Sequence, residues 1–499
     1  WSLPSAEVRK KPEGSPMSQK QTVDIAIVGA GTAGLSAYRE ARKYTERIVL
    51  IEGGEGGTTC AQEGCMPSKL LIAAAEAARQ VKRAPAFGLK IDKAEISGAA
   101  VLSRVRRERD RFVRLVKEGS AHISNERQRK GYARFIAPQC LQVGETQIEA
   151  KAIVLATGSS PFIPDMFNTL SKRLVTSADV FEWQDLPDSV AVFGAGIVGL
   201  ELGVALHYLG VRVAIFGKNN NLAGLSDPEV KKVAQEILSQ ELPIDLNADV
   251  QSLTETDQGV EICWQKAGQQ YRKTFAYVLV SAGRKPNLAA LNLEQLNIER
   301  DQHGLPDWDP ETLKLKGHPI FLAGDNNNMR PLLHEAGDEG RLAGYNAAHY
   351  PEMKTIQRRS SLAIVFSHPQ IMQVGTPYQE LALDCTAIGE ADFSDQGRSR
   401  VILENQGLLR IYAAHENQAF LGAEMVGPAA EHLAHLLAWA HQQKMSIPAM
   451  LKLPFYHPTL EEGLKTALKA TQRTLKDGPP MGSPCSGEYV IEEPGDFTA

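Results

Sequence analysis

One short glycine pattern occurs twice in the sequence, and this repeat constrains the fold more than any other feature. The run "GAGTAG" places Gly29, Gly31 and Gly34 directly after the apolar run "DIAIV". The run "GAGIVG" places Gly194, Gly196 and Gly199 directly after "SVAVF". Each copy lies between a strand-like and a helix-like segment, where glycines let the backbone approach a pyrophosphate at a helix N-terminus. The sequence therefore predicts an α/β fold with two Rossmann-like dinucleotide-binding domains.

The two copies differ at the residue expected to bind ribose. Glu52 follows Gly34 by 18 residues, at the end of the apolar run "RIVLIE", and can accept hydrogen bonds from a ribose diol. The same step from Gly199 reaches Gly217, which is followed by Lys218. Lys218 could bind the 2′-phosphate of NADP, or it could be a solvated surface lysine, and both interpretations stay open. Two dinucleotide sites in one chain favour two different nucleotides, a tightly held flavin and an exchangeable nicotinamide.

A pair of cysteines lies in "GGTTCAQEGCMPSK", where four residues separate Cys60 from Cys65. A zinc site would need two further ligands, and the sequence has no second close Cys or Cys/His pair. The other cysteines, Cys140, Cys263, Cys385 and Cys485, are scattered. The spacing of the pair allows a disulfide, so we interpret it as a redox pair. The following Met-Pro-Ser is typical of a helix start, which would place Cys65 where the helix dipole stabilises a thiolate.

A candidate proton carrier lies in "FYHPTLEEG" near the C-terminus. His457 precedes a helix that we expect to begin near Thr459, and histidine exchanges protons near neutral pH. Glu462 could orient the imidazole. Glu462 could equally form a capping box with Thr459, because Thr-x-x-Glu is the pattern of that motif. Both roles stay open.

Together these motifs carry a family resemblance. "GAGTAG", the C-x4-C-x-P-S-K run, "GAGIVGLE", "AGD" and "HPTLEE" resemble those of the pyridine nucleotide–disulfide oxidoreductases, over roughly Asp24 to Leu475. Within that family the chain is most similar to the dihydrolipoamide dehydrogenases. The resemblance implies an FAD domain interrupted by an NAD(P) domain, followed by a C-terminal α+β dimerisation domain. The expected division is 1–21 as a disordered extension or residues ahead of a start at Met17, 22–160 and 289–357 as the FAD domain, 161–288 as the NAD(P) domain, 358–474 as the dimerisation domain and 475–499 as a flexible tail.

The resemblance also implies roles for single residues. Cys60 would exchange with substrate and Cys65 would lie against the flavin. His457 and Glu462 would form an acid–base dyad that reaches the disulfide of the opposite subunit in a homodimer. Lys69 and Glu201 would pair near the flavin, and Asp325 would bind its ribityl chain. The full set of expected cofactor-binding residues is Gly29, Gly31, Gly34, Glu52, Gly57, Thr58, Thr59, Lys69, Ala133, Thr157, Gly158, Gly324 and Asp325, with Gly194, Gly196, Gly199, Glu201, Lys218 and Gly283.

The implied function is FAD-dependent oxidation of dihydrolipoyl groups by NAD, with NADP possible, through the cysteine pair. The substrate would be a lipoyl-bearing protein or free dihydrolipoamide. An alternative is an NADPH-dependent disulfide reductase of the glutathione reductase type, although Ile197 stands where those enzymes carry a gating tyrosine. A second alternative is a flavoprotein that acts mainly as a docking subunit. Cys485 stands alone, so the C-terminal cysteine pair of mercuric reductases is not expected.

Charge and hydropathy bear on partners and location. The net charge of −5 provides no broad basic surface for nucleic acid. No apolar run has the ~18–20 residues that a membrane-spanning helix needs. The N-terminal residues lack the apolar core of a signal peptide. We therefore expect a cytoplasmic protein.

Overall fold

The computed structural model describes residues 19–92, 94–479, 483 and 485, and the chain forms two compact units. Among the described residues, the first unit contains 19–58, 114–160 and 285–356, and the second contains 59–92, 94–113, 161–284, 357–479, 483 and 485. The chain passes between the units within α4 (Gly98–Ser120), β7 (Ser159–Pro161) and β16 (Arg284–Pro286). Short 3-10 helices are η1 (Ala84–Phe87), η2 (Asn125–Arg127), η3 (Asp165–Phe167), η4 (Ala289–Leu291), η5 (Leu293–Leu296), η6 (Asp325–Asn327), η7 (Tyr378–Glu380) and η8 (Leu383–Cys385).

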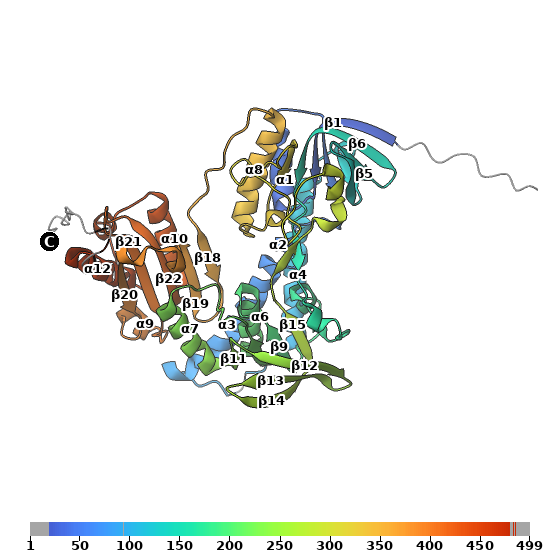
Figure 1. Cartoon of the computed structure of the whole chain (residues 1–499). Coiled ribbons are helices and arrows are strands. Elements are labelled where there is room, and N and C mark those ends of the chain that lie inside the picture. The colour runs from blue at the N-terminus through green and yellow to red at the C-terminus, as the bar shows by residue number, and fades with distance from the viewer. Residues whose placement is uncertain (1–18, 93, 480–482, 484, 486–499) are drawn as a thin grey trace, which may run out of the picture. The chain divides into compact units, whose positions relative to one another are not determined.

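The first unit is built on a mixed sheet in the order β3-β2-β1-β6-β5-β4, with β17 paired to β6. Its strands are β1 (Gln19–Val28), β2 (Ile48–Glu52), β3 (Gln128–Lys130), β4 (Ala133–Ala137), β5 (Cys140–Val143), β6 (Thr146–Leu155) and β17 (Ile320–Leu322). The central strands are parallel and their apolar residues are buried, as expected for strands covered on both faces. Helices α1 (Thr32–Ala41) and α8 (Leu333–His349) pack side by side (Figure 1).

Strand β1 begins earlier than the sequence boundary at residue 22. Gln19, Lys20 and Gln21 pair in parallel register with Thr146 to Ile148 of β6, and Lys20 forms an ion pair with Glu149 at 2.7 Å. These residues are polar and mostly exposed, so they give no hydrophobic pattern, and backbone hydrogen bonds with the exposed ion pair extend the strand. The predicted N-terminal extension is therefore wrong for 19–21, and its remaining residues, 1–18, lie outside the described part of the chain.

The second unit holds the second glycine motif in a five-stranded parallel sheet, in the order β11-β10-β9-β15-β8. These strands are β8 (Leu174–Val175), β9 (Ser189–Phe193), β10 (Arg212–Phe216), β11 (Ile244–Asp245) and β15 (Tyr277–Val280). An antiparallel sheet of β12 (Asp249–Thr256), β13 (Gly259–Lys266) and β14 (Gln269–Phe275) adjoins them through a shared apolar core. The helices of this region are α5 (Ser177–Val180), α6 (Ile197–Tyr208) and α7 (Pro228–Glu241).

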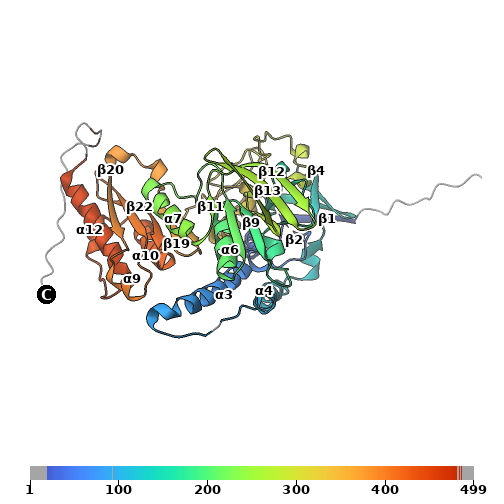
Figure 2. The ribbon, with the colours of Figure 1, turned by 90° about the horizontal axis from the view of Figure 1, so that it is seen from below.

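The cysteine segment also belongs to the second unit. It forms the short helix α2 (Thr59–Gln62) and the longer helix α3 (Cys65–Arg83). Helix α3 packs against α6, as both ribbon views show (Figure 2). Leu71 and Ala75 of α3 are buried in the same apolar core as Leu202 and Leu206 of α6. These contacts hold the cysteine-bearing helix α3 against α6, the helix that follows the second glycine motif.

The C-terminal part is an antiparallel sheet in the order β18-β19-β22-β21-β20 with helices packed on it. Its strands are β18 (Leu362–Val365), β19 (Gln370–Gly375), β20 (Thr386–Asp392), β21 (Leu408–Ala414) and β22 (Phe420–Gly427). Its helices are α9 (Gly397–Val401), α10 (Ala430–Gln442), α11 (Ile447–Leu451) and α12 (Glu461–Asp477). Leu409 and Ile411 join the core with α10 and α12. Arg410, between them, points to the other face, as strand alternation requires.

A buried aspartate joins α7 to that other face. Asp227 caps α7 by accepting from the backbone N–H of Glu229 at 2.9 Å and is fully buried. Its carboxylate also accepts from the Arg410 guanidinium at 2.8 Å and from the Tyr412 hydroxyl at 2.9 Å. These bonds satisfy a charge that burial would otherwise destabilise.

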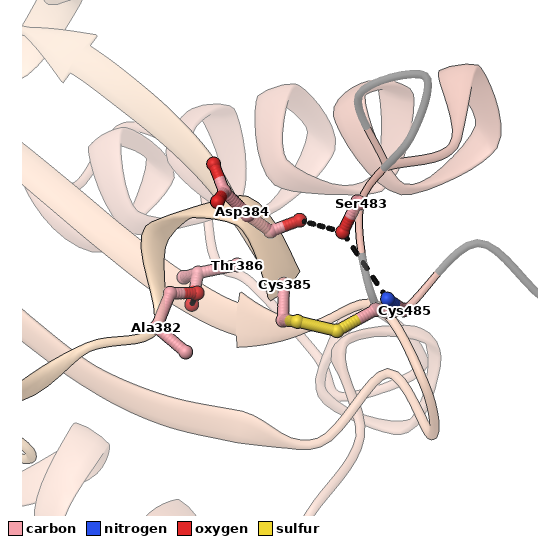
Figure 3. The surroundings of a disulfide bond; sticks show 6 residues. All are labelled: Ala382, Asp384, Cys385, Thr386, Ser483 and Cys485. Carbon is pink, nitrogen blue, oxygen red and sulfur yellow. Dashed lines mark hydrogen bonds between the residues drawn. A yellow bond between two sulfur atoms is a disulfide. The ribbon is translucent and has the colours of Figure 1, made fainter.

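The C-terminal segment is covalently attached to this domain. Cys485, which is alone in the sequence pattern, forms a disulfide with Cys385, 100 residues away, with their α-carbons 5.5 Å apart (Figure 3). The Ser483 hydroxyl donates to the Asp384 carbonyl at 2.7 Å beside this bond. Helix α12 continues to Asp477, and Leu475 is buried in the core. The flexible-tail prediction is therefore wrong for 475–477, since Leu475 packs in the core. Residues 480–482, 484 and 486–499 lie outside the described part.

We expect Cys485→Ser to lower the free energy of unfolding by about 2–4 kcal/mol, because a disulfide that closes a long loop restricts the unfolded chain. Urea denaturation of the oxidised protein measures the loss. Cys385→Ser should lose the same amount, and the double variant no more, because both remove one bond. Cys140→Ser, at a free cysteine of the first unit, is the control. Additive losses from the two single variants would contradict the bond.

Candidate active site

The first glycine motif forms a tight turn between β1 and α1. Gly29 has φ +104°, and a Cβ there would lie 2.3 Å from the Ala156 carbonyl oxygen. A Cβ at Gly34 would lie 1.8 Å from the Gly29 carbonyl oxygen. Gly31, in contrast, faces open space and starts α1 without a side-chain cap. The turn therefore leaves room and free N–H groups for a phosphate at the helix N-terminus.

Glu52 lies beside this turn at the end of β2, as the sequence predicts. Its carboxylate accepts from the backbone N–H of Ala30 at 2.7 Å and of Gly54 at 2.7 Å. These bonds fix the carboxylate at the carboxyl edge of the sheet, and each oxygen keeps a lone pair for a ribose hydroxyl. The Glu52 carboxylate, which can accept from ribose hydroxyls, and the open turn fit the adenosine end of FAD.

Other expected flavin-binding residues gather at the same edge of the first unit. Asp325 opens η6, and its Oδ2 accepts from the Ser159 hydroxyl at 3.0 Å. The next residue, Asn326, is fully buried and donates to the Leu155 carbonyl at 2.8 Å, while its Oδ1 is a buried acceptor without a partner within the described residues. Sequence reasoning missed Asn326, although it directly follows the "AGD" motif. An unsatisfied buried acceptor next to Asp325 is consistent with a bound group there.

The remaining expected residues divide between the two units. Ala133 begins β4, Thr157 follows β6, and Gly158 has φ +67° and accepts at its carbonyl from the Asn287 N–H at 3.0 Å. Gly57 has φ +105° and Thr58 φ +62°, so both adopt the left-handed conformation in the loop before α2. These residues and Gly324 belong to the first unit, whereas Thr59, Lys69 and Gly283 belong to the second.

The second glycine motif repeats the turn geometry of the first. Gly194 has φ +119°, and a Cβ there would lie 2.3 Å from the Ser281 carbonyl oxygen. A Cβ at Gly199 would lie 1.9 Å from the Gly194 carbonyl oxygen, while Gly196 again faces open space. A cavity of about 790 Å³ lies in front of this turn, and Lys218 and Gly283 line it. Its size suits a nicotinamide dinucleotide.

Gly217 at this cavity has a steric explanation. A Cβ at this position would lie 2.9 Å from the Leu246 α-carbon, which is backbone and cannot move aside easily. The Gly217 N–H donates to the Asp245 carbonyl at 2.6 Å, which holds the two segments together. The neighbouring segment therefore occupies the space that a side chain at position 217 would need, which explains why no carboxylate stands there.

The cysteine pair is brought together at the start of α3. Cys65 is the first residue of the helix, as predicted, and Gly64 precedes it without a side-chain cap. Both thiols are free in this structure, and the Cys60 thiol hydrogen-bonds to the Cys65 sulfur. Cys60 is half-buried and Cys65 is exposed. The arrangement corresponds to the reduced form of a redox pair.

An ion pair lies on the same helix, one turn after Cys65. The Lys69 ammonium donates to Glu201 of α6 at 2.7 Å, and the Glu201 side chain is 5% exposed. Glu201 also accepts from the backbone N–H of Phe366 at 3.1 Å, and Lys69 lies 4.6 Å from the centre of the Phe366 ring. Sequence reasoning missed Phe366, because it precedes β19 with no motif around it. The pair fixes α3 against α6 and the Phe366 loop.

The charges around the thiols separate their pKa values. The hydrogen bond from Cys60 lowers the pKa of Cys65 to about 6; desolvation opposes this shift and the Lys69 charge adds to it. The same hydrogen bond and burial raise the pKa of Cys60. One thiolate and one thiol therefore coexist near neutral pH, with the negative charge on Cys65.

The end of α3 is held by a second charge cluster. Glu404 accepts from Arg79 at 2.6 Å, contacts Arg83 and forms an ion pair with His368 at 3.0 Å. Burial opposes ionisation of Glu404, but His368 and Arg79 outweigh it and lower its pKa to about 2. The helix that begins at Cys65 is therefore anchored near both ends.

His457, which precedes α12, lies beside Glu462 in the first turn of that helix. The imidazole Nδ1 lies 3.0 Å from Glu462 Oε2 and 3.1 Å from Oε1, and this contact lowers the pKa of Glu462. Since an ionised carboxylate can only accept, Nδ1 is the donor, and in a neutral imidazole Nε2 is then free to accept a proton. The Glu462 carboxylate also accepts from the Thr459 N–H at 3.2 Å. The Thr459 hydroxyl donates to the Tyr456 carbonyl instead of capping the helix, so half of the capping box forms.

Comparison with known proteins identifies the family. The sequence model of the pyridine nucleotide-disulphide oxidoreductases matches residues 23–340, and that of their dimerisation domain matches 362–468. The chain belongs to the pyridine nucleotide-disulphide oxidoreductase family. Members bind FAD and a nicotinamide nucleotide, so the chain is a flavoprotein oxidoreductase that carries a dimerisation domain. No helix of the described residues is long and apolar enough to cross a membrane.

The relatives and solved structures that match most of this chain carry different enzyme names. The dihydrolipoyl dehydrogenase of Chlamydia pneumoniae is 28% identical over 465 residues, which covers 91% of this chain and 98% of the relative. The mercuric reductase of Staphylococcus aureus is 27% identical, over 89% of this chain and 81% of the relative. Two solved structures, LpdA from Mycobacterium tuberculosis and the HOCl-induced flavoprotein disulfide reductase RclA from Escherichia coli, share the fold. Their TM-scores are 0.76 and 0.74 at 23% and 20% identity, covering 90% and 89% of this chain and 99% of each structure.

The low pKa of Cys65 predicts a pH-dependent reactivity. In the reduced protein, alkylation of Cys65 should rise through a midpoint near pH 6, because only the thiolate reacts and its pKa is about 6. Lys69→Met should move the midpoint to higher pH, because it removes a positive charge and leaves the Glu201 carboxylate nearby. Lys69→Arg keeps the charge and serves as the control.

Peptide-resolved mass spectrometry after brief iodoacetamide treatment at a series of pH values makes this measurement. A wild-type midpoint near the ordinary thiol value of about 8.5 would contradict the assignment. An unchanged midpoint in Lys69→Met would show that Lys69 does not lower the pKa of Cys65.

Proposed function

We propose that the chain is a dihydrolipoamide dehydrogenase, which oxidises dihydrolipoyl groups with NAD(P) through the Cys60–Cys65 pair. The observation that carries the proposal is the pair itself, a low-pKa thiolate and a protonated thiol at the start of α3. Dihydrolipoyl dehydrogenases that match over nearly the whole chain support the substrate class. The mercuric reductase and RclA relatives carry other names, so the substrate class is decided by experiment and not by the names of the relatives.

The chemistry begins from the oxidised pair. His457 Nε2 takes a proton from one substrate thiol, and the resulting thiolate attacks the Cys60 sulfur. The Cys60–Cys65 bond breaks, and Cys65 leaves as the thiolate that its environment stabilises. The second substrate thiol then attacks the first substrate sulfur, and Cys60 leaves as a thiol. The substrate loses two electrons and two protons, and the cysteine pair gains the two electrons.

The cofactors complete the reaction. FAD, when bound, would supply the two-electron chemistry that links the cysteine pair to the nicotinamide nucleotide. For the chain's own residues, the turn at Gly29–Gly34 with Glu52 and Asp325 would hold FAD. The turn at Gly194–Gly199 with Lys218 and Gly283 would hold the nicotinamide nucleotide. Lys69 and Glu201 would position the start of α3 and keep the charge on Cys65.

The exposure of the His457 segment supports a shared site in a homodimer. The His457 side chain is 81% exposed and the neighbouring Tyr456 is 83% exposed. A general base needs a defined position against its substrate, which an imidazole standing in water lacks. The segment belongs to the part of the chain that matches the dimerisation domain. We therefore assign His457 to act on the cysteine pair of a partner subunit.

We expect His457→Ala to lower kcat/KM for dihydrolipoamide by ~10²–10⁴-fold, the usual range for loss of a general base. Reduction of a quinone by NADH should largely persist, because that reaction needs no thiol deprotonation. His303→Ala, at an exposed histidine of the first unit, is the matched control. Equal losses in both assays would point to damaged folding or dimerisation and would remove His457 from proton transfer.

Glu462 has two contacts, so its variant separates two effects. Glu462→Gln keeps an acceptor for the Thr459 N–H but removes the charge that stabilises the imidazolium. We expect dithiol oxidation to fall at least ~10-fold while the melting temperature stays close to that of wild type. A loss of stability with activity retained would assign Glu462 to the helix start alone.

The substrate class is tested by steady-state rates of the FAD-loaded protein. We expect dihydrolipoamide to be oxidised with NAD at a kcat/KM at least ~10²-fold above that for reduction of oxidised glutathione by NADPH. Free dihydrolipoamide suffices, so turnover without any partner protein would exclude a purely docking role. Preference for oxidised glutathione with NADPH would replace the proposal by a disulfide reductase of the glutathione reductase type.

A further inference from the structure

The polar residues of the second-unit cavity point to how the nicotinamide nucleotide is selected. The inference rests on the proposed nicotinamide site but not on the dithiol chemistry. Phe162, Ile197 and Val198 are apolar lining residues of the cavity, and its charged lining residues are Lys218, Asp249 and Arg284. Gly217 and Lys218 line it directly after β10. The end of β10 is where the adenosine ribose is expected.

The segment that excludes a side chain at Gly217 brings its own carboxylate to the cavity. Residues 245–248 bond to Gly217 from both directions, because the Gly217 N–H donates to the Asp245 carbonyl at 2.6 Å and the Ala248 N–H donates to the Gly217 carbonyl at 3.3 Å. Asp249 follows immediately and lines the cavity. We propose that Asp249, rather than residue 217, is the carboxylate that binds the adenosine ribose hydroxyls and selects NAD over NADP.

The nearby acids and bases favour this assignment. The Asp245 carboxylate does not line the cavity: its Oδ1 accepts from the Asn247 N–H at 3.1 Å, and its Oδ2 lies 3.9 Å from the Lys266 ammonium. Asp249 is exposed and begins β12, where it pairs with Gln265 of β13, so its short side chain stands on a backbone fixed in a sheet. A carboxylate there can accept both hydroxyls of a ribose diol and repels a 2′-phosphate.

Lys218 lines the same cavity but is less suited than Asp249 to discriminate between NAD and NADP. Its ammonium stands on a long flexible side chain, exposed to solvent, ahead of Asn219 and Asn220, which both have positive φ. The Asp249 carboxylate in the same cavity opposes the attraction that Lys218 exerts on a 2′-phosphate. One lysine with an acid nearby is a weak phosphate site.

The test measures discrimination on the FAD-loaded full chain, using quinone reduction by NADH and by NADPH. We expect wild type to prefer NADH. Asp249→Asn should lower the NADH/NADPH ratio of kcat/KM at least ~10-fold, through KM, because a hydrogen bond to a charged group is lost and a repulsion is removed. Asp257→Asn makes the same charge change at an exposed residue of the β12–β13 turn, outside the cavity, and should keep the ratio. Lys218→Ala should change the ratio by less than ~3-fold.

Binding of 5′-ADP and 2′,5′-ADP, followed by calorimetry, probes the ribose end without any thiol chemistry. Asp249→Asn should weaken 5′-ADP and strengthen 2′,5′-ADP. An unchanged ratio in Asp249→Asn together with a large loss of NADPH use in Lys218→Ala would overturn the inference, as would equal losses for both nucleotides. A protein that selects NADH through Asp249 but fails to oxidise dithiols would overturn the proposed function and leave this inference standing.

Discussion

The contact between two glycines of one turn is the constraint on which the structure depends. A Cβ at Gly34 or Gly199 would lie less than 2 Å from the carbonyl oxygen of Gly29 or Gly194. Because neither position tolerates a side chain, each helix starts directly on the end of its strand, with free N–H groups at the carboxyl edge of the sheet. The second of these helices, α6, then provides Glu201, which holds the cysteine-bearing helix. A steric limit at one turn is thus linked to the chemistry of a thiol.

The sequence predicts the features that have short-range causes. The glycine turns, Glu52 at the end of β2 and Cys65 at a helix start follow from motifs with fixed spacing. The Lys69–Glu201 pair joins residues 132 positions apart and is expected only from the family resemblance. Other features that depend on distant segments could not be predicted. No local pattern pairs Cys385 with Cys485, and the polar start of β1 is held by backbone hydrogen bonds to β6 and by the Lys20–Glu149 ion pair. Leu246 fills the space at Gly217 from a strand connection about thirty residues away, so the sequence shows a missing acid but not its cause.

Buried acids join the parts of the second unit. Asp227 connects α7 to Arg410 and Tyr412, and Glu424 accepts from the backbone N–H groups of Ser226 and Asp227 at 2.9 Å. Glu404, in the segment between α9 and β21, accepts from Arg79 and so joins this segment to α3. Because the pKa of Glu404 is lowered from 4.5 to about 2, its stabilising contribution is present above pH 4.5 and is lost as the pH falls toward 2. The helix that carries the thiols thus depends on a charge that persists throughout the neutral range.

The Cys385–Cys485 bond makes most of the C-terminal domain a covalent ring. A proteolytic cut inside this ring releases no fragment until a reductant opens it, so gels run with and without reductant report different molecules. The substrates proposed for the protein are themselves dithiols, which reduce disulfides by exchange. An assay mixture that supplies substrate therefore also supplies a reagent for this second bond. The species that turns over and the species studied in oxidising buffer are then two covalent forms of one chain.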